Sequence, residues 1–265
     1  MTPGWGAHAS GSLDAVNASV RVATLNCRNA VDGWPKRRRL LMDQLIELNP
    51  HVIGLQELRH FLPAQASWIA REVGRRTGQA YWLHDTYKTG LWWLWEGIAI
   101  LSQLPILERD SLGLDGDNRV ANFARLRLPA GGLLDVYNTH LAARGAEVRR
   151  AQVEAILAWM TRRPGTAQIL LGDFNAAPSA ASIRFACQTL RSAYAEANGS
   201  EPERTVPTPL RRVADWSRGV VLDYIFVNDA VEVRDARVTF DRPAAGDVRL
   251  YASDHFGLAA TVSVR

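Results

Sequence analysis

The chain has 265 residues, of which 47% are hydrophobic and 22% are charged. That balance is ordinary for a protein with a sizeable buried core, and it excludes a disordered chain, a collagen and a coiled coil. The formal net charge of +4 is too small to indicate a protein that binds nucleic acid by charge alone. The only two cysteines, Cys27 and Cys187, lie too far apart in sequence for a metal-binding pair and are too few for a disulfide framework.

The hydrophobic pattern predicts about ten strands and four helices. Leu41, Leu45 and Leu48, for example, have the spacing of one helix face. The proline-rich residues 196–219 are expected to form a long loop, and the whole pattern fits two sheets with helices outside them. In chain order, the expected elements are strand 20–25, helix 36–48, strand 51–56, helix 64–76, strands 80–84, 97–102, 120–128 and 133–141, helix 144–163, strand 168–171, helix 179–190, and strands 220–227, 231–240 and 258–264.

Residues 1–19 are rich in glycine, alanine and serine and lack the pattern of a signal peptide, so we expect a flexible tail there. No apolar run reaches the ~18 residues that a membrane-spanning helix needs. These features favour a cytoplasmic protein. Neither a repeat nor a low-complexity linker interrupts residues 20–265, so we expect a single domain, and a monomer.

Six apolar runs end in, or are followed or flanked by, a carboxylate, amide or imidazole group. One of these groups alone has an ordinary explanation, such as a turn cap or a satisfied core histidine. Together they point to one cleft, because strand ends at the same edge of a sheet converge and buried carboxylates are costly unless they are paired or bound to a metal. The polar groups are those of Asn26, Glu57, His140, Asp173 with Asn175, Asp223, and Asp254 with His255.

The chemistry of this set indicates hydrolysis of a phosphate ester. Carboxylates and amides without cysteine ligands suit a hard cation such as Mg²⁺ or Mn²⁺. Two histidines beside them provide acid–base groups near neutral pH. Attack of water on phosphorus needs a hard metal that neutralises the charge of the phosphoryl oxygens and groups that accept and donate protons.

Seven short motifs occur in a fixed order along residues 20–264. Together they resemble the endonuclease/exonuclease/phosphatase superfamily of DNase I-like, metal-dependent phosphoesterases. The resemblance implies a catalytic domain that is a four-layer α/β (α+β) sandwich, with two central mixed β-sheets flanked by helices. The motifs are TLN at 24–26, LQE at 55–57, GIAILS at 97–102, NTHL at 138–141, GDFNAAP at 172–178, LDYIFV at 222–227 and SDH at 253–255.

The resemblance also implies a site for Mg²⁺ or Mn²⁺. Asn26 and Glu57 match the metal-site residues of the family, with Glu57 the principal ligand, and Asp254 is expected to contribute. The chain departs from the family at Arg28, where members similar to AP endonucleases often have an acidic second ligand. That difference weakens both a two-metal site and an AP endonuclease activity. Arg28 itself either contacts a phosphate or is an ordinary surface arginine.

The catalytic roles implied by the resemblance fall on five positions. Asp173 is expected to activate or orient the attacking water, and Asn175 to help hold the phosphate. His255 matches the catalytic histidine. His140 resembles the second histidine of the DNase and sphingomyelinase branches, and Asp223 is expected to orient it.

Substrate choice is predicted from loops. The indoles of Trp92, Trp93 and Trp95 suit base stacking, a lipid interface, a lid over the cleft or plain core packing. Arg211 is a candidate phosphate contact, and the basic run 36–39 either tracks phosphates or is a solvated helix end. A nuclease or nucleotide phosphodiesterase is favoured. The alternatives are a phospholipid or sphingomyelin phosphodiesterase that binds the lipid head group, a phosphatase of a small metabolite and, last, a catalytically inactive binding module.

Overall fold

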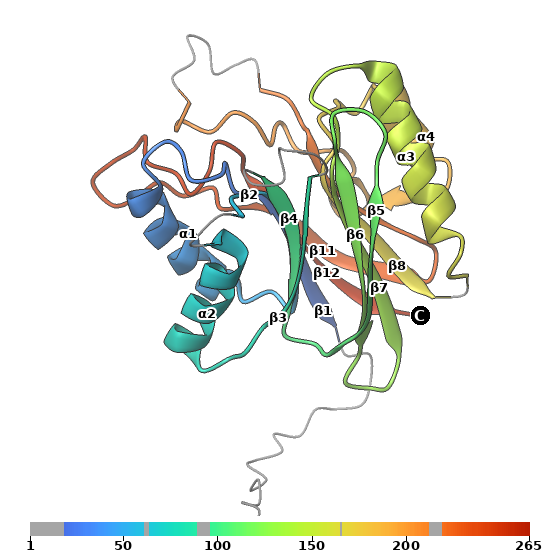
Figure 1. The fold of residues 1–265 in the computed structure, drawn as a ribbon, viewed down its shortest axis with the longest axis horizontal. Coiled ribbons are helices and arrows are strands. Elements are labelled where there is room, and N and C mark those ends of the chain that lie inside the picture. The colour runs from blue at the N-terminus through green and yellow to red at the C-terminus, as the bar shows by residue number, and fades with distance from the viewer. Residues whose placement is uncertain (1–18, 61–63, 89–95, 165, 212–218) are drawn as a thin grey trace, which may run out of the picture.

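Two six-stranded sheets lie face to face at the centre of the molecule (Figure 1). The computed structural model describes residues 19–60, 64–88, 96–164, 166–211 and 219–265. The first sheet has the order β11 (Val231–Thr239), β12 (Gly257–Val264), β1 (Val20–Asn26), β2 (Val52–Leu58), β4 (Gly97–Ser102) and β3 (Trp82–Tyr87). The second has the order β5 (Ile106–Gly113), β6 (Val120–Arg127), β7 (Leu133–His140), β8 (Ala167–Asp173), β10 (Asp223–Val227) and β9 (Arg191–Ser192).

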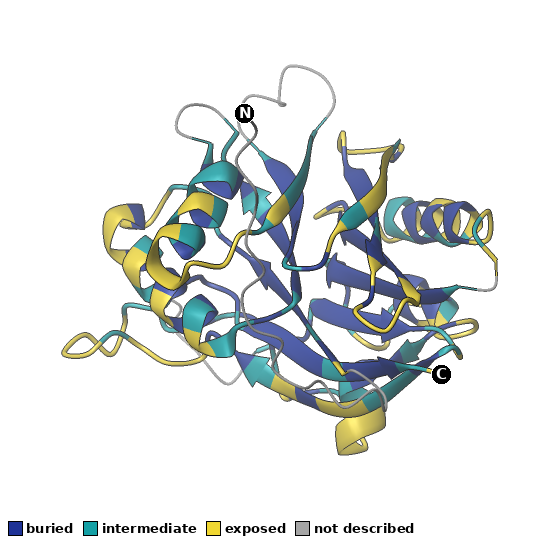
Figure 2. Ribbon diagram, turned by 90° about the horizontal axis from the view of Figure 1, so that it is seen from below, coloured by how far each residue is buried: buried dark blue, intermediate teal, exposed yellow. Residues whose placement is uncertain are grey.

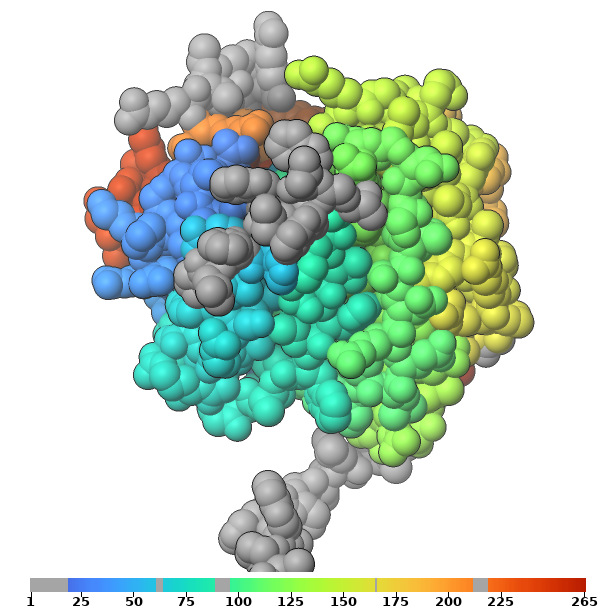
Figure 3. Space-filling view, in the orientation of Figure 1, coloured from blue at the N-terminus to red at the C-terminus, as the bar shows by residue number. Residues whose placement is uncertain are grey.

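Helices cover the outer face of each sheet. The pair α1 (Trp34–Leu48) and α2 (Gln65–Thr77) packs on the first sheet, and the pair α3 (Ala146–Met160) and α4 (Ala181–Ala186) packs on the second (Figure 1). The space-filling view shows the same division, with the blue and cyan residues on one side and the green and yellow residues on the other (Figure 3). The predicted four-layer sandwich with two mixed sheets is therefore confirmed.

The inner faces of the two sheets share one apolar core. Val22 and Ile100 of the first sheet and Val136 and Ile169 of the second belong to the same cluster, and all four are fully buried. Figure 2 shows this as continuous dark blue on the facing strands. These strands bury side chains on both faces. Their sequences are therefore uninterrupted hydrophobic stretches.

Polar side chains also join the sheets beneath the end where the site lies. The Gln56 amide donates to Asn138 Oδ1 at 2.7 Å, and Asn138 Nδ2 donates to the carbonyl oxygen of Ala99 at 3.1 Å. Gly54 permits the close approach, because a Cβ there would lie 2.0 Å from Leu171 Cδ1. The relative position of the two sheets is thus fixed directly below the strand ends that carry the polar groups.

Several observed bounds differ by a few residues from the expected ones, the two-residue strand β9 was not expected, and two further differences are larger. The strand β5 was missed because its residues are mostly exposed, as expected of a strand at the edge of a sheet. The helix expected over 179–190 ends at Ala186, and a further helix, α5 (Ala193–Asn198), begins where Ser192 accepts a hydrogen bond from the amide of Ala195. In the described part of the chain, no helix is long and apolar enough to cross a membrane.

Strand direction brings the polar strand ends together. The neighbours β1 and β2 are parallel, as are β7 and β8, so each pair ends at the same edge of its sheet. His140 and Asp173 are directly paired at the end of β7 and β8. Since β10 runs antiparallel to β8, it begins at that edge, with Asp223 opposite Asp173.

Candidate active site

The predicted polar residues meet in a cleft with a cavity volume of about 460 Å³. Asn26 and Asp223 lie behind its wall, fully buried, and contact the residues that form it. The sequence-based prediction of a single polar cleft therefore agrees with the arrangement of these side chains. The predicted residues that line the cleft are Glu57, His140, Asp173, Asn175, Arg211, Asp254 and His255.

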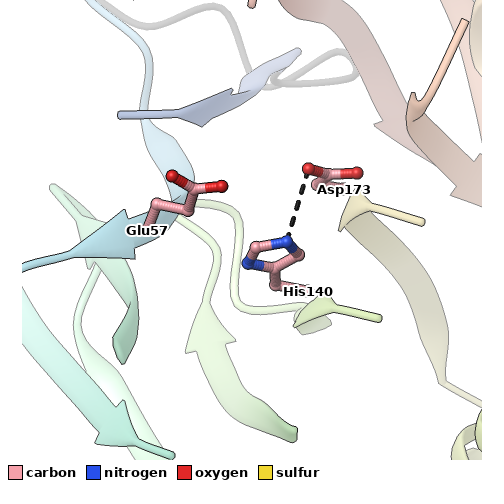
Figure 4. Close-up of side chains that lie close together, drawn as sticks. All are labelled: Glu57, His140 and Asp173. Carbon is pink, nitrogen blue, oxygen red and sulfur yellow. Dashed lines mark ion pairs between the residues drawn. The ribbon is translucent and has the colours of Figure 1, made fainter. Parts of the chain in front are cut away.

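Glu57, His140 and Asp173 form the centre of the cleft (Figure 4). Each offers a ligand atom that lies within 4.8 Å of the other two. Glu57 adopts a left-handed φ of 49°, within an irregularity in the pairing of β2 with β4. A bulge of this kind redirects a side chain at the end of a strand, and a positive φ at a residue other than glycine is a strained conformation typical of functional sites.

Asn26 links the two central carboxylates. Its Nδ2 donates to Glu57 Oε1 at 3.1 Å and to Asp173 Oδ2 at 2.9 Å. Its Oδ1 accepts a hydrogen bond from the amide of Arg28 at 3.0 Å, which fixes the orientation of the amide group. The carboxylate oxygens of Glu57 and Asp173, with no thiolate beside them, suit a hard divalent cation.

Asp173 is held as a carboxylate. Burial alone would raise the pKa of Asp173, but the charges of His140 and His255 and the hydrogen bond from Asn26 outweigh it and lower that pKa. The second oxygen of the Asp173 carboxylate accepts the backbone amide of Asn175 at 2.8 Å. A negative group that faces the cleft is therefore present at neutral pH, as orientation or deprotonation of a water molecule requires.

His255 and Asp223 form a buried ion pair, with 2.9 Å between Nδ1 and Oδ2. Burial alone would lower the pKa of His255, but the carboxylates of Asp223 and Asp173 raise it to about 10. Burial also raises the pKa of Asp223, and the charge of Asp173 adds to that effect. The prediction that Asp223 orients His140 is wrong, since Asp223 faces His255.

His140 has a different set of partners. Its Nδ1 lies 2.9 Å from Arg119 Nη1 and 3.3 Å from Glu96 Oε1. Its Nε2 lies 3.5 Å from Asp173 Oδ2. Burial would raise the pKa of Glu96, but His140 and Lys88 lower it to about 2, so Glu96 is a carboxylate at neutral pH.

Glu96 and Arg119 were missed at the sequence level, although a signal for them exists. Each directly precedes a strand, β4 or β6, that runs antiparallel to the strand beside it. The start of such a strand lies at the same edge as the end of its neighbour. Polar residues that directly precede a strand are therefore candidates for the cleft, as are those that follow one, and Glu96 and Arg119 are both of this kind.

Asp254 faces two arginines. Its Oδ2 lies 2.8 Å from Arg211 Nε and 3.4 Å from Arg28 Nη1. Arg211 lines the cleft, and the side chain of Arg28 also pairs with Asp32 at 2.9 Å. The metal role of Asp254 and the substrate roles of both arginines stay predictions. Trp92, Trp93 and Trp95 lie outside the described residues.

The basic run 36–39 contains one residue that neither of the expected roles fits. Arg37 is fully buried, and its guanidinium donates to backbone carbonyl oxygens, among them those of Cys27 at 3.1 Å and Ala252 at 2.8 Å. It therefore neither tracks a phosphate nor forms a solvated helix end.

Comparison with known proteins identifies related chains. The sequence model of the Endonuclease/Exonuclease/phosphatase family matches residues 23–255. Protein angel of Drosophila melanogaster is 27% identical over 272 residues, which cover 88% of this chain and 73% of that protein. Nocturnin of the same organism is 25% identical over 88% of this chain and 42% of its own length, so the chain spans less than half of that relative.

A solved structure shows the same fold. The catalytic domain of human Nocturnin with a bound sulfate anion superposes with a TM-score of 0.74 at 22% sequence identity. The match covers 94% of this chain and 97% of that domain.

Proposed function

Since this chain belongs to the endonuclease/exonuclease/phosphatase family and is a phosphate-ester hydrolase, we propose that it cleaves phosphodiester bonds with a divalent metal ion, Mg²⁺ or Mn²⁺. The substrate that we propose is a nucleic acid or a nucleotide. The observation that carries this proposal is the cluster of Glu57, His140 and Asp173, with the His255–Asp223 pair beside it. The carboxylate of Asp173, whose pKa is lowered, and the protonated imidazole of His255 provide a proton acceptor and a proton donor in one cleft.

Glu57 would hold the metal, since its carboxylate lines the cleft. Asn26, which is buried behind the wall with its amide against Glu57, and Asp254 are the further candidates. When bound, the metal would neutralise negative charge on the phosphoryl oxygens. Members of the family generally depend on a divalent metal. The amide of Asn26 also lowers the repulsion between the carboxylates of Glu57 and Asp173 by donating to both.

The chain's own residues suggest how protons move. Asp173 accepts the proton of the attacking water, whose oxygen forms the new bond to phosphorus as the bond to the leaving oxygen breaks. His255, which Asp223 and Asp173 keep protonated, donates to that leaving oxygen. His140, whose Nε2 lies 3.5 Å from Asp173 Oδ2, would bind phosphoryl oxygens in the cleft.

The walls of the cleft favour a nucleotide unit. Arg119 and Arg211 line it with positive charge, and Val206, Val220 and Leu222 add an apolar side. A volume of about 460 Å³ is within the usual range for small-molecule sites and suits one nucleotide. Guanidinium groups suit phosphate oxygens, and apolar side chains suit the sugar and base.

Hydrolysis of bis-p-nitrophenyl phosphate tests the reaction class. We expect turnover with Mg²⁺ or Mn²⁺, loss of turnover in EDTA, and loss of most activity in Asp173→Asn and His255→Ala. Asp229→Asn, at a 96% exposed carboxylate, is the control. Because p-nitrophenolate leaves without a proton, His255→Ala should lose more activity on a nucleotide diester than on this substrate. Unchanged turnover in EDTA would refute the metal dependence.

A substrate panel tests the nucleic-acid assignment. Single-stranded RNA, plasmid DNA, dinucleotides, sphingomyelin and phosphomonoesters are compared at equal enzyme concentration. We expect RNA, DNA or a dinucleotide to give the highest kcat/KM, with binding that weakens as salt rises because phosphates on the substrate release counterions. A preference for sphingomyelin or for a phosphomonoester would refute the assignment and leave the phosphoesterase chemistry intact.

A further inference from the structure

A buried cation lies outside the cleft and underneath two of its loops. Arg37 of α1 is fully buried, and in the described part of the chain no carboxylate forms an ion pair with it. A buried charge without a counter-ion is costly unless hydrogen bonds compensate for it. Its position therefore calls for an explanation beyond helix stability.

Backbone carbonyl oxygens supply that compensation. The five N–H groups of the guanidinium make seven hydrogen bonds of 2.7 to 3.2 Å, two from Nε, two from Nη1 and three from Nη2, so that Nε and Nη2 each share a hydrogen between two acceptors. Five of the six acceptors lie in the segment between β1 and α1, and the sixth lies just before the catalytic histidine. The acceptors are the carbonyl oxygens of Cys27, Arg28, Asn29, Val31, Asp32 and Ala252.

The segment from Cys27 to Asp32, here called the β1–α1 loop, is bent around this cation. Arg28, Asn29 and Asp32 have φ values of 57°, 46° and 50°, a left-handed conformation that costs side-chain-bearing residues about 1 kcal/mol or more each. The bend turns the carbonyl oxygens inward. Without the guanidinium, those oxygens would lose their partners, and the loop would relax toward ordinary backbone angles.

The loop conformation determines how the metal-site residues lie. The amide of Arg28 donates to Asn26 Oδ1, which leaves Asn26 Nδ2 directed at Glu57 and Asp173. The amide of Asn29 donates to the carbonyl oxygen of Glu57 at 2.8 Å. The β1–α1 loop thus orients two of the predicted metal-site residues.

The other acceptor connects Arg37 to the catalytic histidine. Ala252 precedes Ser253, whose hydroxyl donates to the carbonyl oxygen of Asn26 at 2.5 Å and accepts the amide of His255 at 3.2 Å. We propose that Arg37 is a positioning residue that holds the metal-site loop and the histidine loop in one fixed relation. The proposal rests on the proposed function, because it assumes that Asn26, Glu57 and His255 act together.

Substitution on the same helix provides the test. Arg37→Met removes the donors, Arg37→Lys keeps the charge but offers three donors from one atom, and Arg39→Met changes an exposed arginine two positions away. At temperatures well below unfolding, we expect kcat on bis-p-nitrophenyl phosphate to fall roughly 10- to 100-fold in both Arg37 variants. KM should change little, and Arg39→Met should match the parent protein.

Chemical rescue separates positioning from plain packing. Guanidinium ions at millimolar concentration should restore kcat of Arg37→Ala along a saturable curve, whereas methylammonium should not, since only the planar ion reaches both loops. A folded Arg37→Met enzyme with the parent kcat would overturn the proposal. So would failure of Arg37→Met, Arg37→Ala and Arg37→Lys alike to fold, which would make Arg37 a folding residue.

Hydrogen exchange measures the order of the two loops without an activity assay. In a folded Arg37→Met or Arg37→Lys protein, amides of residues 27–32 and 252–255 should exchange faster, while those of β8 keep their protection. Unchanged exchange in both loops would refute the positioning role. If the parent protein hydrolyses no phosphate ester, the proposed function fails, and the exchange data still decide whether Arg37 fixes the loops.

Discussion

Replacing Asp223 by asparagine removes the carboxylate that holds the proton of His255. The two side chains are buried, with 2.9 Å between Oδ2 and Nδ1, and the exchange to an amide changes the charge with little change in shape. The charge of Asp173, 4.0 Å from Nδ1, remains. The variant therefore isolates the effect of one charge on one imidazole.

The expected change in the pKa of His255 follows from the distance between its imidazole and the carboxylate of Asp223. At an effective dielectric constant of about 20, two unit charges 4 Å apart interact by about 4 kcal/mol, which corresponds to a change of about 3 in a pKa. Asp223 is nearer than that to His255, so its loss should lower the pKa of His255 from about 10 to about 7 or below. The imidazole would then lose its proton near neutral pH.

NMR titration of the imidazole Cε1–H in metal-free protein measures this directly. His255→Gln identifies the resonance, and Asp229→Asn is the control at an exposed carboxylate. We expect a midpoint near pH 10 in the parent protein and near or below 7 in Asp223→Asn. Midpoints that agree within one pH unit would show that Asp223 does not set the protonation of His255, and would refute the proton-donor role argued from the pair.

Stability should depend on pH in the same variant. The pKa of His255 in the folded protein is raised above its value of 6.5 in the unfolded chain, so its stabilising contribution is complete below pH 6.5 and is lost as the pH rises through about 10. The free energy of unfolding of Asp223→Asn should therefore differ more from that of the parent near pH 6, where His255 is protonated and pairs with Asp223, than near pH 10. Urea unfolding at pH 6 and at pH 10 measures the difference, which should shrink at the higher pH.

Two further substitutions test the surroundings of the cleft. Glu96→Gln should lower kcat by roughly tenfold or more, because His140 loses its carboxylate partner. It should also lower the free energy of unfolding by about 2 kcal/mol at pH 7, and this loss should disappear as the pH falls from 4.5 through about 2, where the parent carboxylate is protonated too. Gly172→Ala should cost about 3 kcal/mol or more in urea unfolding, since φ is +139° and a Cβ would lie 2.0 Å from the carbonyl oxygen of Thr139. Gly113→Ala, in open space on the edge strand β5, should change stability by less than about 0.5 kcal/mol.

Buried strands were predictable because their apolar runs are continuous. The strand at Gly97–Ser102 was predicted with its observed bounds, and all of its residues are buried. The strand β5 gave no such signal, because an edge strand that faces water carries charges such as those of Glu108, Arg109 and Asp110. Buried strands are thus recognised in the sequence by their apolar runs. An exposed edge strand has the polar composition of a loop and is not recognised.

Arg37 shows a different limit of the sequence. It stands between Lys36 and Arg38 in a run of four basic residues, and nothing in their order distinguishes it from its neighbours. Its burial depends on the β1–α1 loop, which folds over one face of the helix and presents its carbonyl oxygens there. Such a role becomes visible only when the loop conformation is known.

The pairing of the histidines follows from the order of strands in the second sheet. The strand β8 lies between β7 and β10, so Asp173 separates His140, at the end of β7, from Asp223, at the start of β10. His140 therefore takes its partners from the other side, where β6 begins after Arg119 and β4 of the facing sheet begins after Glu96. His255 enters ahead of β12, a strand of the first sheet that contacts β10, and so reaches Asp223. Strand order in a sheet is not strand order in the chain. The strand ends therefore indicated that both histidines lie in the cleft, but the family resemblance assigned Asp223 to the wrong one.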